Sequence, residues 1–357
     1  MCQDLVSGIP PLSVVRLMRL LISEDMASMD SRQKKRLMWQ VPFLLLLVIG
    51  TVLIIRQQRS MPYQHEEGFV FGTVYSVTYQ YDRSLKAEIE AALAEVDGEF
   101  SMFNEKSTVA RHNRGEQVQQ SKMYKEVYDL AQVVTRETDG AFDITVAPLV
   151  NAWGFGFKKK GGEEGAGTPT PQQVDSLLKI RNQFDFSAIA KGYGSDVVAR
   201  LLRSFDIRNF MVEIGGEVVT QGISQRRLPW KIGVTKPSDD SLSTSGELQT
   251  VLNVTDIAMA TSGNYRNFYY KGGQKFAHTI DPKTGYPVQH SLLSATVLAK
   301  SCATADAYAT SFMVLGLDGA KKVLDRHPEL MAYFIFARPD GSYDVWFSPT
   351  LKEKIED

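Results

Sequence analysis

The hydrophobic pattern separates one long apolar run near the N-terminus from a body of shorter amphipathic segments. Residues 37–55 carry no charged side chain, and basic residues stand on both sides of the run, at Arg32, Lys34, Lys35 and Arg36 before it and at Arg56 and Arg59 after it. The run has about 19 residues, close to the roughly 20 that a helix needs to span a bilayer. A buried core helix would not explain basic residues at both ends, so the pattern predicts a transmembrane helix.

The flanking charges also predict an orientation for this helix. The heavier basic cluster precedes the run, which places residues 1–36 in the cytoplasm and the body on the periplasmic, or extracytoplasmic, side. No small-residue cleavage site follows the run, and no cysteine stands where a lipoprotein signal needs one. We therefore predict a single-pass, uncleaved signal-anchor at 37–55 in the cytoplasmic (inner) membrane, with residues 56–68 as a linker. Met29, just before the basic cluster, is an alternative start to Met1.

The first part of the body predicts one strand and two amphipathic helices. Residues 69–81 are rich in β-branched and aromatic side chains, as in a strand. Apolar side chains then recur at helical spacing in two segments. The first contains Ile89, Leu93, Val96 and Phe100, and the second begins at Ser121, contains Val127, Leu130, Val133 and Val134, and ends at Gly140.

The rest of the body predicts strands and helices in separate stretches. A Gly-rich loop at 158–168 precedes Thr170-Pro171, a helix start. We expect helices at 188–205 and 303–315, the latter ended by Gly316 and followed by a further short helix. Strands are expected at 209–214, 217–223, 230–235, 250–254 and 295–299, with two more near the C-terminus. Because no βαβ repeat appears, the fold class predicted is α+β.

Composition narrows the partners and the metal chemistry. The 357 residues include 40 Lys plus Arg and 41 Asp plus Glu, so the chain lacks the basic excess that a nucleic-acid-binding protein uses against phosphates. We expect no nucleic-acid partner. The only cysteines are Cys2 and Cys302, which excludes a disulfide framework and a thiolate zinc cluster. A metal in this protein would need oxygen ligands.

Asp306 and Thr310 are the first candidates for such ligands. In a helix, residues four apart share one face, and these two fall near the start of the helix predicted at 303–315. Magnesium takes one or two carboxylates and fills its shell with waters and substrate phosphates, which a sparse site allows. A solvated Asp and a surface Thr would show the same spacing.

Two further segments carry groups suited to phosphate chemistry. His278 lies in a turn-rich stretch with Asp281 three residues on, and an imidazole there could take a proton from an attacking hydroxyl. Residues 185–193 open a helix with small side chains, so backbone amides could approach a phosphate while Lys191 adds charge. A structural histidine and an ordinary strand-to-helix turn are the alternative interpretations. Glycine turns are expected at 213–217 and 261–265, and 142–155 offers an apolar, aromatic surface for a planar ring.

Taken together and in order, these motifs resemble the FAD:protein FMN transferase family, also called the ApbE family. The resemblance runs from about Phe71 to the C-terminus. It is carried by Phe-Gly-Thr at 71–73, Phe-Asp-Ile-Thr at 142–145, Pro-Leu-Val-Asn-Ala-Trp-Gly-Phe-Gly at 148–156, Asp-Phe-Ser-Ala-Ile-Ala-Lys-Gly-Tyr at 185–193, Glu-Ile-Gly-Gly at 213–216, Thr-Ser-Gly-Asn-Tyr at 261–265, His-Thr-Ile-Asp-Pro at 278–282 and Asp-Ala-Tyr-Ala-Thr at 306–310.

The resemblance implies a T-fold-like body of mixed sheets and packed helices over residues 69–350, with FAD in a cleft and Mg²⁺ on its pyrophosphate. It implies that Asp306, Thr310 and the backbone carbonyl of Ala188 hold the metal and that His278 is the catalytic base. It also implies that FAD is held where relatives hold it, at Phe71, Phe103, Ala141, Phe142, Asp143, Lys191 and Ile280. Many relatives are lipoproteins, whereas this chain has an apparent transmembrane anchor.

The function that this resemblance implies is magnesium-dependent transfer of the FMN half of FAD to a Thr or Ser hydroxyl of a membrane-bound redox-complex subunit, with release of AMP. One alternative uses water as the nucleophile and makes the chain an FAD pyrophosphatase that gives FMN and AMP. Another is a non-catalytic flavin-binding assembly factor. The presence of Asp306, Thr310 and His278 favours the transferase over the assembly factor.

Overall fold

The N-terminal unit contains one long helix. The computed structural model describes residues 30–156, 168–236, 248–264, 268–271, 274–340 and 342–356, and the chain divides into unit Met1–Pro62 and unit Tyr63–Asp357. Helix α2 (Ser31–Ser60) includes the window Trp39–Arg56, with a mean hydropathy of 2.0 and none of it buried. The helix is long and apolar enough to cross a membrane, and it extends beyond the predicted span at both ends.

The body begins with a hairpin where the sequence predicted a linker and a single strand. Strands β1 (Tyr63–Val70) and β2 (Thr73–Gln80) pair antiparallel, and the linker prediction is wrong for residues 63–68. Phe71 and Gly72 both have positive φ, at 52° and 75°, as the two central residues of a type I′ hairpin turn require. Strand β1 was not predicted because His65, Glu66 and Glu67 are polar, and an edge strand tolerates polar residues on both faces.

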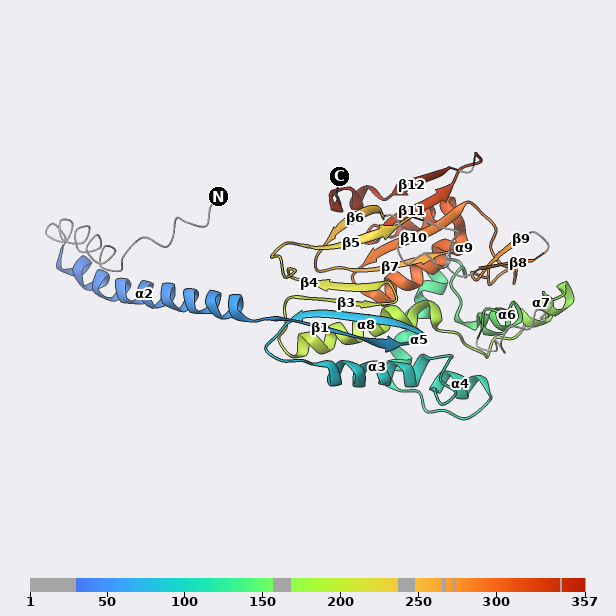
Figure 1. Cartoon of the computed structure of the whole chain (residues 1–357), viewed down its shortest axis with the longest axis horizontal. Helices are drawn as coiled ribbons and strands as arrows, with labels where there is room; N and C mark the ends of the chain where they lie inside the picture. The colour runs from blue at the N-terminus through green and yellow to red at the C-terminus, as the bar shows by residue number, and fades with distance from the viewer. Residues whose placement is uncertain are drawn as a thin grey trace. The chain divides into compact units, whose positions relative to one another are not determined.

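The centre of the body is an eight-stranded sheet in the order β1-β2-β3-β4-β7-β10-β11-β12 (Figure 1). Its other strands are β3 (Phe210–Ile214), β4 (Glu217–Gln221), β7 (Ala258–Gly263), β10 (Leu292–Ala299), β11 (Met331–Ala337) and β12 (Tyr343–Phe347). Every neighbouring pair is antiparallel. The expected mixed sheets are therefore wrong, because hairpins and antiparallel returns, not βαβ crossovers, join the strands.

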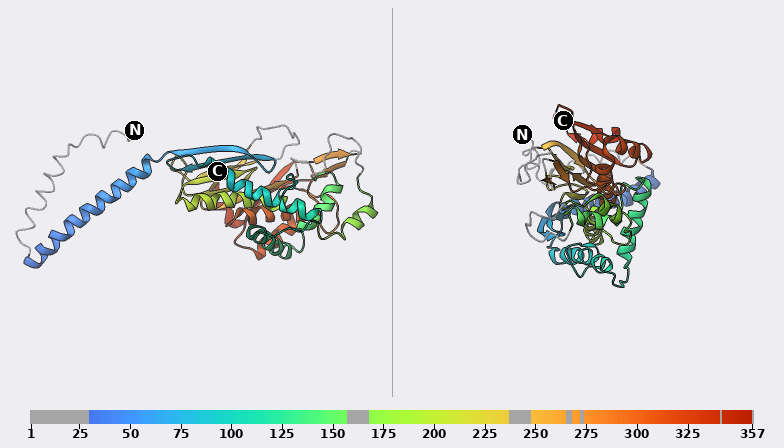
Figure 2. Two further views of the ribbon diagram at one scale, coloured as in Figure 1. Left: turned by 90° about the horizontal axis from the view of Figure 1, so that it is seen from below. Right: turned by 90° about the vertical axis from the view of Figure 1, so that its right-hand side faces the viewer.

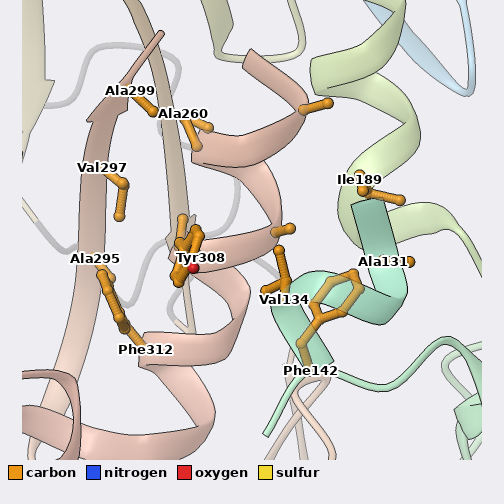
Figure 3. Close-up of a cluster of buried hydrophobic side chains, with 14 of the residues drawn as sticks. Ala131, Val134, Phe142, Ile189, Ala260, Ala295, Val297, Ala299, Tyr308 and Phe312 are labelled. Carbon is orange, nitrogen blue, oxygen red and sulfur yellow. The ribbon is translucent and has the colours of Figure 1, made fainter. Parts of the chain in front are cut away.

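One face of this sheet is covered by helices, which keeps helices and strands in separate layers as an α+β fold requires (Figure 2). Helices α8 and α9 contact the sheet. Helix α3 packs on α8, and helix α5 packs on α8 and α9. The helical segments are α3 (Lys86–Phe100), α4 (Thr108–Asn113), α5 (Lys122–Glu137), η1 (Ile144–Val146), α6 (Ala147–Ala152), α7 (Pro171–Leu177), α8 (Ser187–Ser204), α9 (Cys302–Arg326) and η2 (Pro349–Lys354). A large apolar cluster fills the space between this layer and the sheet (Figure 3).

The opposite face of the sheet carries a second, three-stranded sheet in the order β13-β6-β5. Its strands are β5 (Trp230–Thr235), β6 (Leu248–Val254) and β13 (Ile355–Glu356). Successive side chains of a central strand point to opposite faces of the sheet and so pack against different layers. Val219 faces the helices, whereas Val218 packs with Trp230 and Leu252 of the small sheet. A separate hairpin, β8 (Phe268–Lys271) with β9 (Gln274–Ala277), lies outside both sheets.

Most predicted elements are confirmed within a few residues. Gly316 has φ 69° and ψ −179° and breaks α9 into the two helices expected on either side of it. Thr170 caps α7 with a complete capping box. The loop predicted at 158–168 lies outside the described residues except for Thr168. The glycine turn expected at 261–265 is wrong for Thr261 to Gly263, which belong to β7.

Candidate active site

Helices α8 and α9 meet so closely that the start of one is built on the backbone of the other. A Cβ on Gly192 would collide with the carbonyl oxygen of Cys302, so only glycine permits this approach. Asp196 of α8 accepts hydrogen bonds from the backbone N–H groups of Cys302 and Ala303, both at 2.9 Å. Ser301 caps α9 by accepting from the N–H of Thr304 at 3.2 Å. The first turns of α9 are therefore held rigidly against α8.

Asp306 lies at this junction and is 2% exposed. Its Oδ2 accepts a hydrogen bond from the N–H of Gly192 at 3.0 Å, and its Oδ1 lies 3.9 Å from Nζ of Lys191. Burial raises the pKa of this carboxyl, although Lys191 and the Gly192 bond oppose the shift. The structure thus brings together two residues that the sequence named separately, Lys191 and Asp306.

A second carboxylate, which the sequence analysis did not select, completes the group. Glu217, the first residue of β4, is 2% exposed, and its Oε1 lies 2.8 Å from Nζ of Lys191. Burial and Asp306 raise the pKa of Glu217 to about 7 against the opposing effect of Lys191. Burial alone would lower the pKa of Lys191, but Asp306 and Glu217 raise it above its ordinary value. The ammonium therefore stays charged between two carboxyl groups.

The remaining predicted metal ligands lie on the same two helices. Thr310 is one turn beyond Asp306 on α9, and its Oγ1 lies 3.2 Å from Oγ of Ser262 on β7. Ala188 is half-buried in the first turn of α8, where it precedes Lys191 by three residues. No three His, Cys, Asp or Glu side chains gather into a metal cluster in the described part of the chain. A carboxylate, a hydroxyl and a backbone carbonyl are all oxygen donors, which suit Mg²⁺, and their joint role as metal ligands stays a prediction.

Two of the predicted flavin contacts lie by the tip of the first hairpin. Phe71 is at the turn, and a Cβ on Gly194 of α8 would lie 2.8 Å from its ring, so the ring packs against the helix that carries Lys191. Phe103 is 63% exposed and its ring approaches Gly72. Of the two rings, that of Phe103 is exposed and could meet a planar ring, whereas the half-buried Phe71 ring packs against α8.

The segment after α5 contributes differently from what its sequence suggests. Ala141 and Phe142 are each 3% exposed, and the Phe142 ring lies in the core beside Val134 and Ala131 (Figure 3). Any contact of Phe142 with a ligand would therefore come through its backbone. The Asp143 carboxylate accepts from the N–H of Thr145 at 2.8 Å and pairs with Arg181 at 2.7 Å.

His278 begins a turn that is held by α6 and by the residues that directly follow α6 and β7. The indole Nε1–H of Trp153 donates to the carbonyl of Gly285 at 2.7 Å, and Ile280, 6% exposed, packs with Leu149 and Trp153. The hydroxyl of Thr279 donates to Asn264 at 2.7 Å. The half-buried His278 ring meets Phe155 edge-on, with centroids 6.4 Å apart.

The Asp281 carboxylate accepts hydrogen bonds from within its own turn. Its Oδ1 accepts from the N–H of Lys283 at 2.9 Å and its Oδ2 from the hydroxyl of Thr284 at 3.1 Å. Both oxygens therefore stabilise the turn itself. Residues 140–144 lie between this turn and the segment before α8, because Gly140 approaches Lys283 and the Ile144 carbonyl accepts from the N–H of Asp185 at 2.7 Å.

A cavity of about 410 Å³ lies on the other face of the sheet from Asp306. It is lined by Glu213, by Gly215 and Gly216, and by residues of β2, β5 and β7, including Thr261. Strand β4 pairs with β7 only at Val218–Met259 and Val219–Ala258, so β7 continues past the start of β4. The Gly215-Gly216 turn therefore lines the cavity directly before Glu217, the residue that pairs with Lys191.

Comparison with known proteins identifies the family. Residues 71–334 match the ApbE family model. A FAD:protein FMN transferase of Haemophilus influenzae is 36% identical over 324 residues, covering 81% of this chain and 90% of the relative. One from Vibrio cholerae is 33% identical, covering 86% and 97%. A solved structure titled flavin transferase ApbE from Vibrio cholerae superposes with a TM-score of 0.72 at 31% identity, covering 82% and 99%.

These findings confirm the predicted family, the predicted enzyme class, since the curated relatives are named FAD:protein FMN transferases, and the predicted combination of α and β layers. The likeness to the T-fold stays a prediction. Because the family model and these relatives each match most of the chain, the chain belongs to the ApbE family.

Proposed function

We propose that this chain is a FAD:protein FMN transferase that moves the FMN half of FAD to a Thr or Ser hydroxyl of a membrane-bound redox subunit, depends on Mg²⁺ and releases AMP. The observation that carries the proposal is the buried group formed by Asp306, Lys191 and the backbone N–H of Gly192 at the contact of α8 and α9. It combines oxygen ligands for a cation with an ammonium for phosphate oxygens. The names of the relatives support the flavin chemistry.

In this proposal the chain holds Mg²⁺ with Asp306, Thr310 and the carbonyl of Ala188. The ion would supply positive charge that offsets the charge of the pyrophosphate. Lys191 lies next to Asp306 and would bind a phosphate oxygen, while Phe71 and Phe103, the backbone at 141–143 and Ile280 would hold the rest of FAD. The buried position of Asp306 strengthens these charge interactions, since water screens them less than at the surface.

The proposed reaction is a displacement at the FMN-side phosphorus of FAD. The acceptor oxygen forms a bond to this phosphorus, the phosphorus–oxygen bond to the AMP half breaks, and AMP leaves with the bridging oxygen. His278 takes the hydroxyl proton. The turn around His278 is fixed by Trp153, Ile280 and Asn264, which suits a base that must meet a protein substrate in one orientation.

The test is to incubate the full chain in detergent with FAD, Mg²⁺ and candidate membrane redox subunits. In-gel flavin fluorescence of the acceptor together with stoichiometric AMP is the expected result. FMN and AMP formed equally with and without acceptor would identify a FAD pyrophosphatase instead. Stable FAD binding without AMP release after Mg²⁺ addition would identify an assembly factor.

We also propose that α2 anchors the body to the outer face of the inner membrane as a single-pass helix, with the catalytic domain spanning 69–350. The apolar window Trp39–Arg56 and the basic residues before it support this topology. Protease added to intact spheroplasts should digest the body. Protection from protease, or a mature N-terminus beyond Ile55, would contradict the anchor.

A further inference from the structure

Glu217 has one carboxylate oxygen with a partner and one without. Oε1 pairs with Lys191 at 2.8 Å, whereas Oε2 is buried and has no hydrogen-bond partner among the residues that the structure describes. A buried carboxylate oxygen that accepts no hydrogen bond loses the hydration it had in the unfolded chain and gains nothing in return, which destabilises the fold. Such an atom in a native site calls for a ligand or an ordered water.

The side chain is also fixed in direction. Glu217 begins β4 on the helix side of the sheet, since the next residue, Val218, packs against the small sheet on the other side. The carbonyl of Glu217 accepts a hydrogen bond from Ser195 Oγ of α8 at 2.9 Å, which ties the strand to this helix. Oε2 therefore belongs to the same enclosed space as Lys191 and Asp306.

Charge in this space is unbalanced. Lys191 is shared between Glu217 at 2.8 Å and Asp306 at 3.9 Å, so one ammonium faces two carboxyl groups. When both are ionised, one negative charge is left over in a buried site, and a cation compensates it best. Magnesium retains several waters in proteins, and each bound water has protons that need acceptors.

We propose that Glu217 is a positioning residue of the magnesium site: Oε1 fixes Lys191 beside Asp306, and Oε2 accepts a hydrogen bond from a water on the ion. The inference rests on the proposed function. It assigns Glu217 no contact with the metal and no proton transfer, so its substitution should act on cation affinity first. Removing such a supporting hydrogen bond typically costs about 10- to 100-fold in metal affinity.

The experiment measures Mn²⁺ binding to the full chain in detergent by electron paramagnetic resonance, with FAD present and acceptor absent. Glu217→Gln keeps the size of the side chain and removes its charge, and should weaken Mn²⁺ binding about 10- to 100-fold. FMN transfer by this variant should recover toward the wild-type rate as Mg²⁺ is raised. Glu126→Gln is the matched control, because Glu126 binds Tyr193 and Arg200 on the outer side of α8, and its Mn²⁺ affinity should stay within about twofold.

Three results separate this inference from the proposed function. Mn²⁺ affinity unchanged in Glu217→Gln, with wild type binding normally, overturns the role of Glu217 alone. Wild type that neither binds Mn²⁺ nor transfers FMN overturns the proposed function. A Glu217→Gln variant with lost transfer that excess Mg²⁺ does not restore also overturns the inference, provided that its melting temperature equals that of wild type. Lys191→Met separates the two parts of the proposal. If adding Glu217→Gln to Lys191→Met weakens Mn²⁺ binding no further, Glu217 acts only through Lys191, and the hydrogen bond from a bound water to Oε2 is overturned.

Discussion

The two halves of the candidate site are built by different means. Asp306 and Lys191 lie on long helices whose contact is fixed by Gly192 and by the Asp196 bonds to the start of α9. His278 lies in a turn held by one indole N–H, by the Thr279–Asn264 bond and by a small apolar cluster. The first half is buried and charged, and the second is partly exposed and locally hydrogen-bonded.

This difference fits a division of labour in the proposed reaction. Holding a cation and a pyrophosphate requires fixed charges away from water, which rigid helices in a core provide. Accepting a proton from a hydroxyl of another protein requires a group near the surface, which turns provide more readily than helices. We therefore expect substitutions in the helix half to change cation and FAD binding, and substitutions in the turn to change the rate of transfer.

Asp306→Ala should have the largest effect. It removes the only side-chain carboxylate assigned to the metal and leaves Lys191 facing Glu217 alone. We expect transfer to fall at least about 10³-fold, since metal charge contributes several kcal/mol of transition-state stabilisation. Gel fluorescence of the acceptor measures transfer, and Asp318→Ala, at an exposed position beyond the Gly316 break in α9, is the control. Full activity of Asp306→Ala at low Mg²⁺ would contradict the role of Asp306 as a metal ligand, and with it the proposed function of the helix half of the site.

His278→Ala should come next and should leave cofactor binding nearly unchanged. Positioned proton transfer contributes about 10²- to 10⁴-fold, so we expect a loss near 10²-fold or more in kcat. Fluorescence titration at saturating Mg²⁺ measures FAD affinity in the same variant. The control is His65→Ala on the edge strand β1. Should His278→Ala lose FAD affinity and regain its rate at high FAD, the turn would be a cofactor site, and the comparison between the halves would fail.

Trp153→Phe tests whether the turn depends on its single indole contact. The variant keeps a ring in the apolar cluster but leaves the Gly285 carbonyl without its donor. We expect a decrease of about tenfold in transfer, because a small displacement of a catalytic group lowers the rate steeply. Mn²⁺ affinity should stay within about twofold. Trp346→Phe on β12 is the matched control, and a loss of Mn²⁺ binding in Trp153→Phe would mean that the two halves are not independent.

The sequence predicted the regular elements better than the site. Helix α8 and strand β5 were expected almost residue for residue, and Gly316 was expected to end a helix, because periodicity and glycine act locally. Strand β1 was not predicted because its polar residues are typical of an edge strand, and the hairpin β8–β9 was not predicted at all. Local patterns also do not show pairing across the fold: Glu217 faces Lys191 only because β4 and α8 come together in the folded chain. The assigned roles of the site residues came from the family resemblance and stay predictions.

Asp196→Asn should have the smallest effect on activity while still reporting on the helix half. The substitution replaces one carboxylate oxygen with an NH₂ group, which cannot accept a hydrogen bond. One of the two bonds from the N–H groups of Cys302 and Ala303 is therefore lost. We expect a cost of about 1–3 kcal/mol in unfolding free energy and a melting temperature several degrees lower. Because Gly192 packing and the Ser301 cap remain, α9 should keep its position, and transfer at 25 °C should stay within about twofold. Differential scanning calorimetry and the gel assay measure the two effects. A tenfold loss of transfer without a change in melting temperature would show that Asp196 acts on the site directly, and that the helix half is less rigid than its contacts indicate.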